Sequence, residues 1–138
     1  MYFIRKGIEY FFPEIDNSIQ NEALELLSSE EKKHFFGMGK YDRYHSLEVY
    51  KKLKETPLKD NRLYLKMALL HDCGKEKTYF VTRVIHKLGF NTKLKNHAEK
   101  GYEKLKEIDR DLAILIKNHH NRNHSEEMNI FQKYDDES

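Results

Sequence analysis

The sequence predicts an all-α protein, a single-domain helical bundle of six to eight helices. Apolar residues recur at intervals of three and four along most of the chain, and no segment shows the alternation expected of a strand. The chain has 138 residues, enough for one hydrophobic core. We therefore interpret residues 1–138 as one domain, with an N-terminal helical extension over 1–27 and the core over 28–138.

Start and stop signals divide the chain into its expected helices. Pro13 ends a short amphipathic helix, Ser28 can cap the next through its hydroxyl, and Asp42 can cap the one after that. Ser125 precedes the last helix. The expected helices are 4–12, 28–37, 42–55, 60–72, 78–88, 92–108, 109–120 and 125–135.

The helix over 60–72 is expected to be the central one, because it is apolar on more than one side. It ends in His71 and Asp72, and Gly74 and Lys75 follow. An imidazole and a carboxylate buried without partners cost several kcal/mol. A metal ion satisfies both, since each is a good ligand and the ion offsets the carboxylate's charge.

Further histidines fall on apolar helix faces. His45 precedes Val49 and Leu53 at i+4 and i+8, a spacing that places it on the buried side of its helix. The same reasoning selects His97, which shares a face with Leu105. It also selects the adjacent pair His119 and His120, which continue the apolar stripe of the helix over 109–120.

Two adjacent aspartates lie near the end of the sequence, and helical spacing distinguishes them. Asp135 lies four residues after Phe131 and seven after Met128, on the buried stripe. Asp136 has the same offsets from Gln132 and Asn129, which places all three on the polar face. Asp135 is therefore the better inward ligand.

For any one histidine, a hydrogen-bonded core residue is the commoner explanation. Five histidines and two aspartates directed into one small core would, however, carry a high desolvation cost without a cation. A shared metal centre accounts for the whole set. The mixture of imidazole and carboxylate suits Mn²⁺, Fe²⁺, Co²⁺ or Zn²⁺ in an open site.

Composition excludes several other classes of protein. The net charge of +2 is too small to indicate nucleic-acid binding. No apolar segment is long enough for a signal core or a membrane span, and the single Cys73 excludes an internal disulfide. We expect a cytoplasmic protein in which Cys73 is a small core residue beside the His-Asp pair.

The order of these residues resembles the HD-domain superfamily of metal-dependent phosphohydrolases, in particular its small stand-alone bacterial members. The resemblance runs from Asp42-Arg43-Tyr44-His45 through His71-Asp72-Cys73-Gly74-Lys75 to Tyr134-Asp135-Asp136, and no Gly-Tyr-Pro signature follows His119-His120. It implies that His45, His71, Asp72 and Asp135 are the common metal ligands. By the same resemblance, His97, His119 and His120 match the extra ligands of members that hold two metals.

The resemblance implies hydrolysis of a nucleotide or another small phosphate ester or anhydride, with one or two divalent ions (Mn, Fe, Co, Zn or Mg), two being favoured. Asp72 would bridge two ions. Gly74 would let the backbone turn sharply, so that Lys75, and with it Arg43, can contact the substrate phosphate. The alternatives are a di-iron oxygenase of the same fold and a sensor that binds a nucleotide or metal without turnover. A homodimer through the aromatic N-terminal segment also stays open.

Overall fold

The computed structural model describes residues 14–75, 97–121 and 125–138. In these ranges the chain is all-helical, with seven helices and no strand, which confirms the predicted fold class. The helices are α2 (Asn17–Leu24), α3 (Ser29–Phe36), α4 (Lys40–Leu53), α5 (Arg62–Leu70), α7 (His97–Leu105), α8 (Arg110–Lys117) and α9 (Glu126–Glu137). The predicted helices over 4–12 and 78–88 lie outside the described residues.

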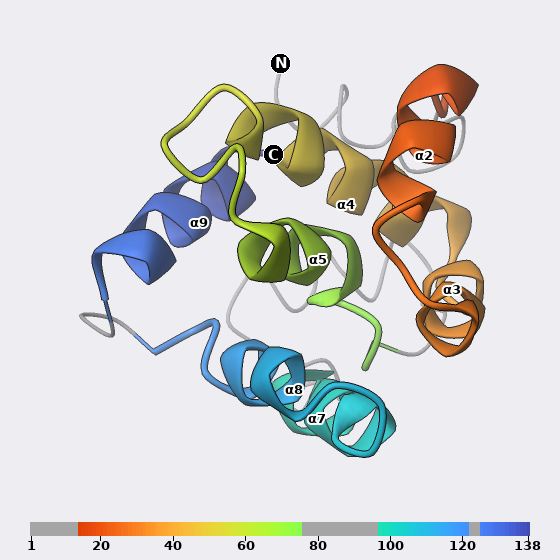
Figure 1. Ribbon diagram of the computed structural model, residues 1–138, viewed down its shortest axis with the longest axis vertical. Helices are drawn as coiled ribbons and strands as arrows, with labels where there is room; N and C mark the ends of the chain where they lie inside the picture. Colours follow the sequence, from red (N-terminus) through yellow and green to blue (C-terminus); the bar gives the residue numbers. More distant parts are fainter. Residues whose placement is uncertain (1–13, 76–96, 122–124) are drawn as a thin grey trace, which may run out of the picture.

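Helix α5 lies at the centre of the bundle, as its sequence predicts. Figure 1 shows α4 and α9 on one side of α5, α8 and α7 on the opposite side, and α2 and α3 at one end. Six of the nine residues of α5 are buried, because apolar side chains surround the whole helix. Those buried residues are Tyr64, Leu65, Met67, Ala68, Leu69 and Leu70.

The observed helix starts follow the capping chemistry of the sequence. Ser28 caps α3 in a capping box with Glu31, and the Ser125 side chain accepts a hydrogen bond from the backbone of Met128 at the start of α9. The expectation that Asp42 caps α4 is wrong. Gly39 is the N-cap of α4 and contributes no side-chain hydrogen bond, while Asp42 lies in the first turn and is buried.

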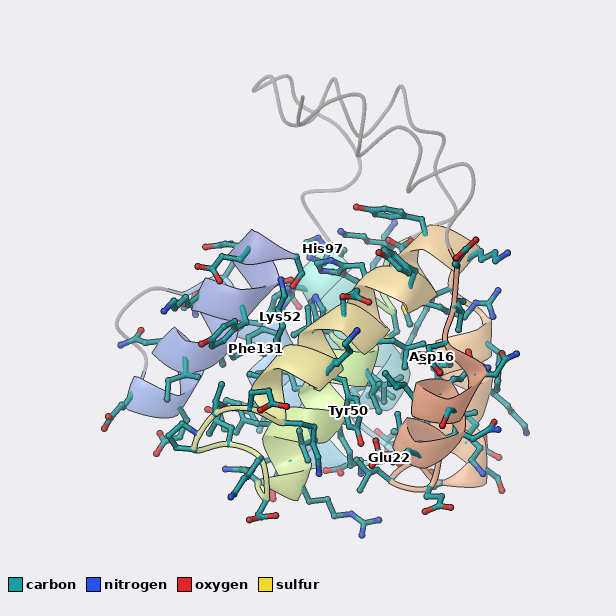
Figure 2. The ribbon with its side chains drawn as sticks, turned by 90° about the horizontal axis from the view of Figure 1, so that it is seen from above. Asp16, Glu22, Tyr50, Lys52, His97 and Phe131 are labelled. Atoms are coloured by element: carbon teal, nitrogen blue, oxygen red, sulfur yellow. The ribbon has the colours of Figure 1, made fainter. Side chains whose placement is uncertain are left out.

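One helix has no counterpart among those expected. Asp16 caps α2 by accepting hydrogen bonds from the backbone amides of Ser18 and Ile19. The Tyr50 hydroxyl, on α4, donates to Glu22 Oε2 on α2 at 3.1 Å, and both residues are labelled in Figure 2. Burial, together with this carboxylate, raises the pKa of Tyr50 to about 12. The helix is short and weakly apolar, so its docking on α4 accounts for its formation.

The ammonium group of Lys66, inside the bundle, connects three of the helices through ion pairs. Lys66 on α5 lies 2.6 Å from Glu31 Oε2 and 2.7 Å from Asp109 Oδ2. Glu31 belongs to the cap of α3 and Asp109 is the N-cap of α8, so one ammonium group joins three helices. Because Glu31 is only 2% exposed, loss of Lys66 would leave a buried, unpaired carboxylate.

Within the described residues, no helix is long and apolar enough to cross a membrane.

Candidate metal centre

Four predicted ligands from three parts of the fold meet at one place, which we call the first donor group: His45, His71, Asp72 and Asp135. His45 belongs to α4 and Asp135 to α9, while His71 and Asp72 follow the last residue of α5. The Nε2 atoms of His45 and His71 lie 2.8 Å and 3.0 Å from Asp135 Oδ1. Asp72 Oδ2 lies 3.3 Å from His71 Nε2 and 3.8 Å from His45 Nε2.

Three imidazoles form a second donor group: His97, His119 and His120. His97 Nε2 lies 3.3 Å from His119 Nε2 and 3.0 Å from His120 Nε2. His97 is the first residue of α7, and Figure 2 shows it at the upper edge of the bundle. The helix expected over 109–120 ends earlier, at Lys117, so His119 and His120 lie in the turn that follows α8.

Asp72 is in contact with both donor groups. Its Oδ2 atom faces His71 at 3.3 Å, and its Oδ1 atom lies 3.5 Å from His97 Nε2. Asp72 is only 3% exposed, and the ring of His71 beside it is packed edge-on against Phe131 of α9 at a centroid distance of 5.2 Å. The two donor groups therefore form one continuous cluster with a carboxylate between them.

The hydrogen bonds of two rings test whether a cation fits this cluster. His71 Nδ1 lies 3.1 Å from the carbonyl oxygen of Ala68, and His119 Nδ1 is hydrogen-bonded to the carbonyl oxygen of Ile116. A carbonyl only accepts, so Nδ1 carries a proton in both rings, and whenever such a ring is neutral its Nε2 lone pair points into the cluster. These lone pairs face carboxylate oxygens or other imidazoles, an arrangement that a cation stabilises and that is usual for histidine ligands.

The spacing of the donor atoms also fits a metal ion. With metal–donor distances of about 2.0–2.2 Å, neighbouring donors in octahedral or tetrahedral geometry are about 2.8–3.6 Å apart. The closest donor pairs within the two groups lie between 2.8 Å and 3.3 Å apart. His and Asp groups in the described part of the chain can thus hold a metal.

The charges of the cluster favour a cation as well. Burial disfavours both carboxylates, yet the neighbouring His71 lowers the pKa of Asp72 and of Asp135, with Lys75 assisting at Asp72 and His45 at Asp135. Burial also opposes a charge on His71, but Asp72 and Asp135 raise its pKa well above the ordinary value. In the metal-free protein a proton on His71 therefore partly offsets the two negative charges.

Binding of a divalent cation is expected to release this proton, because His71 must be neutral to donate its Nε2 lone pair. Since the pKa of metal-free His71 is raised, a proton competes with the cation and metal affinity falls as the pH falls. Titration calorimetry with Mn²⁺ at pH 7, in buffers of different ionisation enthalpy, should give release of about one proton per protein. A binding enthalpy that does not depend on the buffer would contradict this expectation.

The second donor group behaves differently. Burial is the main reason that the pKa of His119 is lowered, to about 3, so His119 is neutral at pH 7 and needs no deprotonation.

Cys73 is a buried core residue, as expected, and burial raises the pKa of its thiol to about 12. A thiol in this state is a poor ligand and a poor nucleophile.

Lys75 lies at the edge of the cluster, with Nζ 3.3 Å from Asp72 Oδ2. The turn expected at Gly74 is present, but the glycine is needed for a different reason: a Cβ atom there would lie 1.9 Å from the carbonyl oxygen of His97 and 2.4 Å from the amide nitrogen of Gly101. The position therefore has no room for a side chain. The guanidinium of Arg43 lies over the Phe36 ring, 5.9 Å from its centroid.

Sequence reasoning missed one buried polar residue beside the site. Gln132, expected on the polar face of the last helix, is only 4% exposed and hydrogen-bonds to the backbone near His119. The sequence spacing of Gln132 indicates burial, because it lies four residues after Met128. It therefore shares the buried helix face on which Asp135 is placed. Lys104, whose Nζ donates to the carbonyl oxygen of Cys73 at 2.8 Å, was likewise not expected.

The helical fold and the clustered histidines and aspartates place this protein in the class of helical proteins that can hold a metal ion. Comparison with known proteins identifies the family. The family model described as HD domain matches residues 43–137, so this chain belongs to the HD domain family. Members of this family are generally metal-dependent phosphohydrolases. No curated protein and no solved structure matches the chain.

Proposed function

We propose that this chain hydrolyses a phosphate ester or anhydride of a nucleotide or another small metabolite, with divalent cations held by the two donor groups. The observation that carries the proposal is the position of Asp72. One of its oxygens faces His71 of the first donor group, and the other faces His97 of the second. A carboxylate placed in this way can serve two cations at once, as phosphoryl transfer with two metal ions requires.

The side chains of this protein would hold the cations, balance their charge and bind the phosphate. Bound divalent cations would lower the pKa of water and polarise a phosphoryl oxygen. The neutral imidazoles direct their lone pairs inward, and Asp72 and Asp135 compensate the cationic charge. Lys75 carries its ammonium group beside Asp72, with 16% of its side chain exposed, where it can bind an anionic phosphate. Arg43 stays a predicted second phosphate contact.

The donor chemistry indicates which metals to test. The second donor group consists of imidazoles, which suit Fe²⁺, Co²⁺ and Zn²⁺ better than Mg²⁺. The first group has two carboxylates, which also accept Mn²⁺ and Mg²⁺. We propose that Mn²⁺, Fe²⁺, Co²⁺ or Zn²⁺ supports turnover and that Mg²⁺ alone supports it poorly, because Mg²⁺ competes weakly for the imidazole group.

The test is phosphate release from a panel of nucleotides and phosphate esters, with each metal added in turn to the metal-free protein. Two neighbouring acids provide the matched variants. Asp135→Asn should lower release on the order of 10²-fold or more, because the first donor group loses a ligand charge. Asp136→Asn, at an exposed position, should stay within about twofold of the natural protein.

Two results would overturn the proposal. One is a protein that binds Mn²⁺ or Co²⁺ tightly but releases no phosphate from any member of the panel. The other is equal release by the natural protein and by Asp135→Asn, which would place the reaction outside this cluster.

A further inference from the structure

We infer that Gln132 is a positioning residue for the second donor group, because its buried amide holds the turn that carries His119 and His120. The inference rests on the proposed function, since it concerns the cations that the donor groups hold. Gln132 lies on α9, three residues before Asp135 of the first donor group. It contacts the backbone of the histidine turn and is not itself a ligand.

The amide group of Gln132 has two hydrogens, and both are donated to this turn. Its Nε2 atom lies 3.0 Å from the carbonyl oxygen of His119 and 2.8 Å from the carbonyl oxygen of Asn121. These two carbonyls flank His120 on either side. One side chain therefore fixes the backbone before and after a proposed ligand.

The turn depends on such a contact because it lies beyond the end of its helix. Helix α8 ends at Lys117, and the carbonyl groups that follow a helix have no partner within it. Local bonds of the turn use the amide of His119, which donates to Ile116, and the amide of Asn121, which donates to Asn118. The hydrogen bonds from Gln132 satisfy carbonyl groups that these local bonds do not use.

The position of Gln132 on α9 links the two donor groups mechanically. Residues 132 and 135 are separated by one helical turn and share a face. Asp135 contacts His45 and His71 of the first group, while Gln132 holds the backbone of the second group. A single turn of α9 thus sets the position of one group relative to the other.

The test is titration of the metal-free protein with Co²⁺, followed by calorimetry and by the visible absorption of the bound ion. Gln132→Met keeps the length of the side chain but removes both donated hydrogens. We expect Co²⁺ binding at the second donor group, called here the second step, to weaken by about 10–100-fold, the usual effect of losing an outer-shell partner. Co²⁺ binding at the first donor group, called here the first step, should change by less than about threefold, because this group keeps all its contacts.

Two further variants separate positioning from loss of stability. Met128→Leu alters a buried side chain one turn earlier on α9 without removing a hydrogen bond, so it should leave both binding steps within about threefold. Gln132→Asn keeps the amide but shortens its reach, and is expected to weaken the second step less than Gln132→Met does. It also provides a measurement if Gln132→Met does not fold.

The outcomes are distinct. Equal weakening of both steps in Gln132→Met, an unchanged second step, or a natural protein that binds only one Co²⁺ would overturn the role of Gln132. A natural protein that binds no Co²⁺ would instead refute the proposed function.

Discussion

Replacing Asp72 by asparagine is expected to remove both cations and to lower metal-dependent phosphate release by at least about 10³-fold. Asparagine keeps the shape of the side chain and one acceptor oxygen, but it loses the negative charge. Because the two oxygens of Asp72 face His71 and His97, this charge serves both donor groups. Metal content after reconstitution and the turnover number of the same sample would measure the effect.

The variant should nevertheless fold, which distinguishes loss of metal from loss of structure. In the metal-free protein, Asp135 still accepts from His45 and His71, and the core of α5 is unchanged. The helical circular dichroism of metal-free Asp72→Asn should therefore match that of the metal-free natural protein. A variant that retained two ions and more than about a tenth of the turnover would refute the bridging role of Asp72.

Replacing Gly74 by alanine is expected to destabilise the metal-free protein by at least about 3 kcal/mol, the upper range for overpacking. The added Cβ would lie 1.9 Å from the carbonyl oxygen of His97 and 2.4 Å from the amide nitrogen of Gly101. Both atoms belong to the backbone of α7, which cannot move without displacing His97. Urea unfolding followed by circular dichroism would measure the free-energy change.

A second glycine at the same contact provides the comparison. A Cβ at Gly101 would meet Cγ2 of Ile116, a side-chain atom, at 2.9 Å. Repacking of this side chain is easier than movement of a backbone, so Gly101→Ala should cost only about 1–2 kcal/mol. If Gly74→Ala were no more destabilising than Gly101→Ala, the close packing of the His71–Lys75 turn against α7 would not be essential for stability.

Much of the fold could be predicted because the relevant signals are local. Helical spacing of apolar residues predicts α5 and its central place, and serine hydroxyls predict the starts of α3 and α9. Side-chain spacing also favours Asp135 over Asp136, and the structure places Asp135 against His45 and His71. Each of these inferences uses only neighbours within about two turns of one helix.

Other features of the site depend on contacts between distant segments. The expectation that Gln132 is solvent-exposed was wrong because a turn some 11 residues earlier in the chain comes back to cover it. Glycine is needed at position 74 because the backbone of α7 lies against it. Asp42 is buried in the first turn of α4, and the N-cap of that helix is Gly39. The α7 partners of Gly74 lie far along the chain from it, so no periodic pattern reveals them. For Gln132, the spacing from Met128 indicates a buried face but not the turn that covers it.

The fold class, the central helix and most of the inward-pointing side chains follow from helical periodicity, because the period of a helix relates each residue to its own face. The grouping of the inward side chains into two donor groups joined by Asp72, and the contact of Gln132 with the second group, follow from how the helices pack. Donor distances of about 3 Å depend on how α4, α5, α7, α8 and α9 pack, and packing is a property of pairs of helices that no single helix carries in its own sequence.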